Sequence, residues 1–166
     1  MLKEPNAAKL IDKYHINGIY KMDELQQAAK VAFATEFSFY LKAQNFHWNV
    51  EGPDFLEYHE LFGKIYGEVY DSIDTFAEQL RAMGTYAPAS FARFSMLTQV
   101  EDETDILPRA VMVQTLMEDN EKIIKILKLV YQQSEANSEF GFSNFIAERI
   151  DAHRKHGWML RASSKE

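Results

Sequence analysis

Two histidines and two acids in the middle of the chain have the residue types and the spacing of metal ligands. His47 and His59 stand twelve residues apart with a Gly-Pro pair between them, and Asp74 and Glu78 stand four residues apart. A spacing of four places two carboxylates above one another on one face of a helix, where they can share a cation. Imidazole and carboxylate groups both bind divalent transition metals. The chemistry that this set predicts is metal binding.

A single helix is predicted to carry three of these four residues. Apolar residues recur at helical spacing from Phe55 until Gly84, which is a typical helix stop. A second stripe, of polar residues and glycines, shares the helix and consists of His59, Gly63, Gly67, Asp71, Asp74, Glu78 and Arg81. His59 precedes Asp74 by 15 residues, which is roughly 22 Å along a helix axis, whereas a metal–ligand bond spans about 2 Å. Either the histidines and acids are unrelated, or they meet across two copies of the helix.

A two-fold axis through the helix would bring the histidine and the acids together. Antiparallel packing of two identical helices pairs His59 of one copy with Asp74 or Glu78 of the other if the axis passes close to Gly67. Gly63 lies one turn from this point, and glycines at a crossing let two backbones approach closely. The spacing therefore predicts a homodimer with a site shared between the chains.

The same residues resemble a known family. The segment His-Trp-Asn-Val-x-Gly-Pro-x-Phe, which begins at His47, is followed by His59 and then by Asp-x-x-x-Glu, and this resembles the ferroxidase signature of the Dps mini-ferritins. The segment 155–160, Lys-His-Gly-Trp-Met-Leu, is similar to the last helix of that family, so the resemblance covers nearly the whole chain. It implies that His47 and His59 bind iron from one subunit, and that Asp74 and Glu78 bind it from the two-fold mate.

The resemblance also implies an activity and an assembly. Fe²⁺ is oxidised by hydrogen peroxide, with dioxygen as an alternative oxidant, and ferric mineral is stored inside a hollow dodecamer built from two-fold dimers. This would protect the cell against oxidative damage. Trp48 would take up stray oxidising equivalents beside the iron, although packing alone explains it equally well. Iron would enter through acidic pores, for which Glu139, Glu148 and Asp151 are the candidates.

One position departs from the family pattern and keeps two alternatives open. The family usually has a further acid four residues after the second histidine, where this chain has Gly63. The site could then hold one iron tightly and a second one weakly. Alternatively, the protein is a non-enzymatic Dps-like shell, or a DNA-associated structural protein, with a degenerate metal site. A third alternative is structural binding of zinc or another divalent ion at the same residues.

The elements predicted from periodicity and helix-end signals form an all-α protein. The predicted helices are 23–49 with Asp23 as its cap, 55–84 with Asp54 as its cap, a short helix capped by Ser90, a third long helix from Pro108 to about Gln133, and a fourth from about Asn144 to Ala162. We expect a ferritin-like four-helix bundle with a short helix in the long crossover connection, in a single domain 1–166. Glu-x-x-His, the intrachain di-iron motif, occurs nowhere in the chain, which favours the shared site.

Composition limits the partners. The net charge of −7 argues against a general affinity for nucleic acid, so DNA binding is not favoured. We expect the arm 1–21, with a helical stretch from Ala7 to Tyr14, to pack on a neighbouring subunit. Cysteine is absent, and no stretch approaches the ~20 apolar residues of a membrane span, so we expect a cytoplasmic protein.

Overall fold

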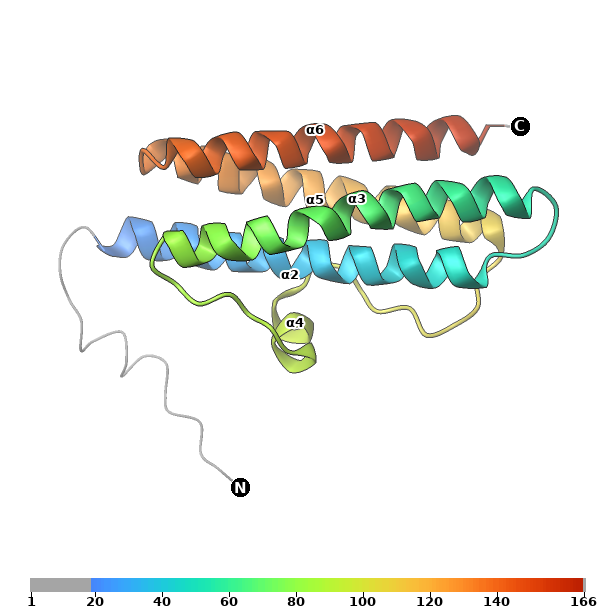
Figure 1. Ribbon diagram of the computed structural model, residues 1–166, viewed down its shortest axis with the longest axis horizontal. Coiled ribbons are helices and arrows are strands. Elements are labelled where there is room, and N and C mark those ends of the chain that lie inside the picture. Colours follow the sequence, from blue (N-terminus) through green and yellow to red (C-terminus); the bar gives the residue numbers. More distant parts are fainter. Residues whose placement is uncertain (1–18, 166) are drawn as a thin grey trace, which may run out of the picture.

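Four long helices form an antiparallel bundle in the computed structural model, which describes residues 19–165 (Figure 1). Its elements are α2 (Ile19–Asn49), α3 (Phe55–Ala82), α4 (Phe91–Leu97), α5 (Arg109–Ala136) and α6 (Phe140–Ser163). Helix α2 packs on α3 and α5, and α5 packs on α6. A long crossover joins α3 to α5 and carries the short helix α4, which lies against α2. The predicted all-α bundle with a helix in its crossover is confirmed.

Large aromatic side chains fill the bundle core. Phe39, Phe62 and Phe76 are fully buried, and Phe76 makes edge-on contact with Phe33 and Phe145 at ring-centre distances of 5.5 and 5.3 Å. Burying one such ring contributes about 2–3 kcal/mol. Within the described residues, no helix is both long and apolar enough to cross a membrane.

The first helix begins earlier than its capping signal predicts. Helix α2 already includes Ile19, so Asp23 lies inside the helix and is not its cap. Residues 19–21 of the predicted arm therefore belong to α2. The rest of the arm, including the helical stretch predicted within it, lies outside the described residues.

Two further capping predictions had different outcomes. Ser90 caps α4 as predicted, because its hydroxyl oxygen accepts a hydrogen bond from the Arg93 N–H at 3.3 Å. Asp54 does occupy the cap position of α3, but its backbone is left-handed, with a φ of 61°, and its side chain makes no capping bond. Its carboxylate instead pairs with Arg109 at 3.1 Å. This ion pair ties the start of α3 to the start of α5.

The turn between α5 and α6 is shorter than the polar stretch in the sequence predicts. Helix α6 begins at Phe140 rather than near Asn144, and α5 continues to Ala136. Only residues 137–139 are left to reverse the chain, and Ser138 does so with a left-handed φ of 60°. The polar stretch in the sequence therefore belongs mostly to the two helix ends, where Ser134 and Ser143 are buried.

Candidate metal centre

The two predicted histidine ligands lie face to face across the turn between α2 and α3. His47 is in the last turn of α2 and His59 is near the start of α3. Their rings stack with centroids 3.7 Å apart and planes inclined by 20°. The chain can reverse so tightly because Gly52 adopts a φ of 99°, a conformation that other residues rarely take.

A reciprocal pair of hydrogen bonds fixes both rings. Nδ1 of His47 lies 2.6 Å from the carbonyl oxygen of His59, and Nδ1 of His59 lies 2.7 Å from the carbonyl oxygen of His47. A carbonyl oxygen only accepts, so each Nδ1 must donate, and each neutral ring then keeps its lone pair on Nε2. Metal-binding histidines commonly have this arrangement, with one ring N–H bonded to a backbone carbonyl. The pair therefore offers two oriented imidazole nitrogens to a metal.

The His47 ring leaves little space for a side chain at Gly63. A Cβ atom at position 63 would lie 3.1 Å from His47 Nδ1 and 3.2 Å from its Cε1. Tyr66 contacts the same ring edge-on, at a centroid distance of 5.0 Å. The glycine thus lets the imidazole approach α3 closely. The missing family acid is therefore also a position where a side chain would press on the first ligand.

The two predicted acid ligands lie elsewhere on the same chain. Asp74 and Glu78 are exposed on α3, and Asp74 is about four helical turns beyond His59. Over residues 19–165, no three His, Cys, Asp or Glu side chains gather closely enough to hold a metal ion. Asp74 also borders a groove of about 840 Å³ that Phe37 and Tyr70 help to line. One chain thus carries a histidine pair and an acid pair that do not meet.

The secondary candidates lie in the last turn of α2 and on α6 or just before it. Trp48 follows His47 in sequence and is 64% exposed. Glu139 directly precedes α6, while Glu148 and Asp151 are exposed on it three residues apart. Their assignment to a pore remains a prediction.

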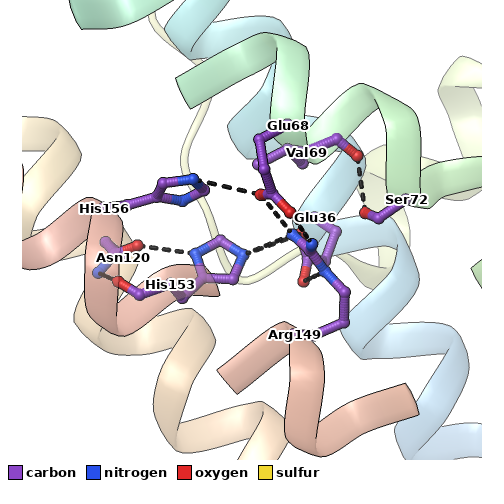
Figure 2. A network of polar contacts seen from close by, with 8 residues as sticks. All are labelled: Glu36, Glu68, Val69, Ser72, Asn120, Arg149, His153 and His156. Carbon is purple, nitrogen blue, oxygen red and sulfur yellow. Dashed lines mark hydrogen bonds and ion pairs between the residues drawn. The ribbon is translucent and has the colours of Figure 1, made fainter. Parts of the chain in front are cut away.

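A polar network in the middle of the bundle is the feature that the sequence analysis missed (Figure 2). It joins all four long helices through Glu36 of α2, Glu68 of α3, Asn120 of α5, and Arg149, His153 and His156 of α6. The Glu68 side chain is 41% exposed, whereas the other five residues are almost fully buried. The sequence does contain a signal for this network. Arg149, His153 and His156 are spaced by four and three residues, which places three polar side chains on the apolar face of α6.

Electrostatics hold the acids of this network ionised. Burial by itself would raise the pKa of Glu36, but the charges and hydrogen bonds of His153 and Arg149 outweigh it and lower the pKa to about 2. For Glu68, the opposing effect of burial is likewise overcome by His156 and Arg149, and the pKa again falls to about 2. Burial lowers the pKa of His156. Negative charge inside the bundle is therefore stabilised by the neighbouring arginine and histidine side chains.

Comparison with known proteins agrees with this architecture. The family described as "Ferritin-like domain" matches residues 27–165. The chain is 30% identical over 123 residues to the DNA protection during starvation protein of Brevibacillus brevis, a match that covers 74% of this chain and 83% of that protein. The crystal structure of a Dps protein from Bacillus brevis superposes with a TM-score of 0.84 at 26% identity, over 88% of this chain and 98% of that one. Dps from Thermosynechococcus elongatus superposes with a TM-score of 0.86 at 22% identity, over 89% and 94% of the two chains.

The family match spans most of the chain, and both the sequence relative and the superposed structures are Dps proteins. The protein is a member of the Dps family of ferritin-like mini-ferritins.

Proposed function

We propose that this protein is a cytoplasmic mini-ferritin that oxidises Fe²⁺ and stores the ferric product. Its ferroxidase site would combine His47 and His59 of one subunit with Asp74 and Glu78 of the two-fold mate. The observation that carries the proposal is the reciprocal histidine pair, which keeps two Nε2 lone pairs free while the acids lie too far along α3 to reach them. Each chain then contributes its two histidines to one site of the dimer and its two acids to the other.

The surface of α3 supports a two-fold dimer of this kind. Nothing lies within 4 Å of a Cβ built on Gly67, so a second helix could approach the backbone closely there. Leu56 and Tyr70, on the same helix, are 71% and 58% exposed, which is typical of side chains that an interface buries. The groove beside Asp74 would receive part of the second copy.

The donor set suits the proposed chemistry. Two Fe²⁺ ions each give one electron to hydrogen peroxide, which with two protons becomes two waters, so no hydroxyl radical is released. Dioxygen is the alternative oxidant. Carboxylates such as Asp74 and Glu78 are hard ligands that stabilise the ferric product, while imidazoles fix the geometry.

In this proposal, the ferric product collects inside a hollow dodecamer assembled from the two-fold dimers. Iron would enter through pores lined by Glu139, Glu148 and Asp151, because clefts of one charge concentrate the opposite ion. Trp48 would quench oxidising equivalents that escape the site.

The first test is oxidation coupled to sizing. Fe²⁺ is added without oxygen to the purified protein, then peroxide, and ferric absorbance is followed before size-exclusion chromatography. We expect rapid oxidation, with iron co-eluting with a large particle. His59→Ala and Asp74→Asn should each slow oxidation at least tenfold, while the matched control Asp71→Asn, an exposed acid one turn away, should not.

Subunit mixing then tests whether the site is shared. A dimer of one His59→Ala chain and one Asp74→Asn chain retains one intact site out of two, formed by the wild-type halves of each chain. Random re-assembly of equal amounts should therefore recover about a quarter of the wild-type rate, although each variant alone is nearly inactive. No recovery in verified mixed particles would refute the shared site.

The glycine at position 63, where the family usually has an acid, favours one competing function, a Dps-like shell without efficient oxidation. The same particle without accelerated oxidation would support it. In that case, Gly63→Asp should add a ligand and increase oxidation, whereas in a competent site it should change little or displace His47.

A further inference from the structure

One guanidinium nitrogen of Arg149 lies among side-chain atoms of the kinds that bind metals, although in the described residues these atoms are too far apart to hold a metal ion as they stand. Its Nη2 is 3.2 Å from Glu68 Oε2, 3.4 Å from Glu36 Oε2 and 3.4 Å from His153 Nε2 (Figure 2). Two carboxylate oxygens and one imidazole nitrogen are the donors that a divalent transition metal prefers. Metal–ligand bonds measure about 2.0–2.2 Å, so each donor would have to close by about 1 Å around a metal at this point.

His153 is already oriented as a metal-binding histidine. Its Nδ1 lies 2.7 Å from the side-chain oxygen of Asn120, and the Asn120 amide nitrogen donates to the His153 backbone carbonyl at 2.9 Å. The second bond fixes which end of the amide faces the ring, so Nδ1 must donate. The ring thereby turns Nε2 toward Glu36, to which it donates a hydrogen bond at 2.9 Å, and a metal in the place of Arg149 would have to displace that proton.

His156 supplies a further donor close by. Its Nε2 lies 3.2 Å from Glu68 Oε2, and its Nδ1 is buried without any hydrogen-bond partner. The residue is only 2% exposed, so solvent does not satisfy this nitrogen. Nε2 donates to the Glu68 carboxylate, which can only accept, whereas the buried Nδ1 without a partner costs free energy.

The charges require a cation at this position. Glu36 is 1% exposed and Arg149 is 4% exposed, and two carboxylates converge on that guanidinium. Buried carboxylates without a partner are strongly destabilising. Ferritin-like di-iron proteins place metal between the four helices, with a Glu from each of two helices and Glu-x-x-His from the others. In this chain the helices supply Arg149 instead, and arginine stays charged under all ordinary conditions.

We propose that Arg149 is a built-in cation that takes the position a divalent transition metal would otherwise occupy inside the bundle and keeps such metals out. Glu36, Glu68 and His153 are the side chains that it holds apart, and His156 contacts Glu68 beside them. Arg149 is thus a selectivity-determining residue, and it confines metal binding to the surface of α3. This role concerns residues outside the proposed ferroxidase site and does not depend on that proposal.

Replacing Arg149 tests this role with Co²⁺ as the probe. All variants carry His59→Ala, so that the surface histidine pair is disabled. Equilibrium dialysis gives the number of Co²⁺ ions per chain, and the visible absorption of Co²⁺ reports on its ligands. Arg149→Ala should bind one additional Co²⁺ per chain, and adding Glu68→Gln should weaken that binding at least tenfold. Arg149→Lys, the matched control, keeps the cation and should bind no additional Co²⁺.

Each outcome decides for or against the proposal. Arg149→Ala that folds only when Co²⁺ is present would support it, because the metal then replaces the missing charge. Three results would overturn it: a folded Arg149→Ala chain that takes up no additional Co²⁺, uptake that Glu68→Gln leaves unchanged, and a chain that stays unfolded with and without Co²⁺. Equal uptake by Arg149→Lys and Arg149→Ala would also overturn it.

Discussion

Replacing Glu36 with glutamine keeps the shape of the side chain but removes its charge from the bundle interior. Glu36 is 1% exposed, accepts a hydrogen bond from His153 Nε2 at 2.9 Å, and lies 3.4 Å from two nitrogens of Arg149. Glutamine leaves the guanidinium and the imidazole without this counter-charge. We therefore expect Glu36→Gln to be less stable than the wild type at neutral pH.

The size of the effect follows from the pKa of Glu36. Its fall from 4.5 to about 2 in the folded state corresponds to about 3 kcal/mol of unfolding free energy at neutral pH, since one pKa unit is worth about 1.4 kcal/mol. Because the folded pKa lies below the unfolded one, this stabilisation is complete above about pH 4.5. It is lost as the pH falls towards about 2. Glutamine does not titrate, so the variant lacks this loss.

Urea unfolding followed by far-UV circular dichroism, from about pH 7 to about pH 2, measures the prediction. One protein concentration is used throughout, because assembly also contributes to stability. The difference between wild type and Glu36→Gln should shrink by about 3 kcal/mol towards the acid end. Glu24→Gln, an exposed acid on the same helix, should follow the wild type at every pH. Parallel pH profiles for wild type and Glu36→Gln would refute the reasoning.

Three further predictions concern other parts of the chain. Lys42→Met should lower the free energy of unfolding in urea by about 2 kcal/mol, because the buried carboxylate of Asp119 loses its partner at 2.6 Å and keeps only Lys122 at 2.9 Å; the absence of a measurable loss would contradict this. Tyr58→Phe should lower the free energy of unfolding by about 1 kcal/mol in the same assay, because the Tyr58 hydroxyl donates to the Ser163 carbonyl at 2.6 Å. An unchanged free energy of unfolding would show that this hydrogen bond does not stabilise the fold. Burial lowers the pKa of His156, so the neutral ring stabilises the fold above about pH 6.5 and stability should decline below it. His156→Gln should flatten this decline, and an unchanged slope would argue against burial as its cause.

Helix number and order could be predicted from the sequence because burial of apolar faces decides them. The Gly-Pro break and the Ser90 cap are local signals, and both lie where they were predicted. Helix ends that depend on distant neighbours were predicted less well. Asp54 resembles a cap in sequence, but it pairs with Arg109, 55 residues further along the chain.

For the functional residues as well, contacts local in sequence could be predicted and long-range contacts could not. His47 and His59 flank one turn, so a local motif was enough to predict that they are close together. The interior network could not be found locally, because Glu36 and Arg149 meet across 113 residues. At Gly63 the sequence shows only that an acid is absent, whereas the structure shows that a Cβ atom there would lie 3.1 Å from the His47 imidazole.

The interior network also bears on how the bundle folds. The hairpin of α2 and α3 contributes Glu36 and Glu68, which are both negative, and the hairpin of α5 and α6 contributes the guanidinium of Arg149. Each hairpin alone would therefore leave these charges without their partners, and docking shifted by a helical turn would separate them again. Apolar ridges tolerate such slippage far better than charges do. The ion pairs thus set the register in which the two halves dock, and we expect them to form late in folding, after each hairpin has closed on its own.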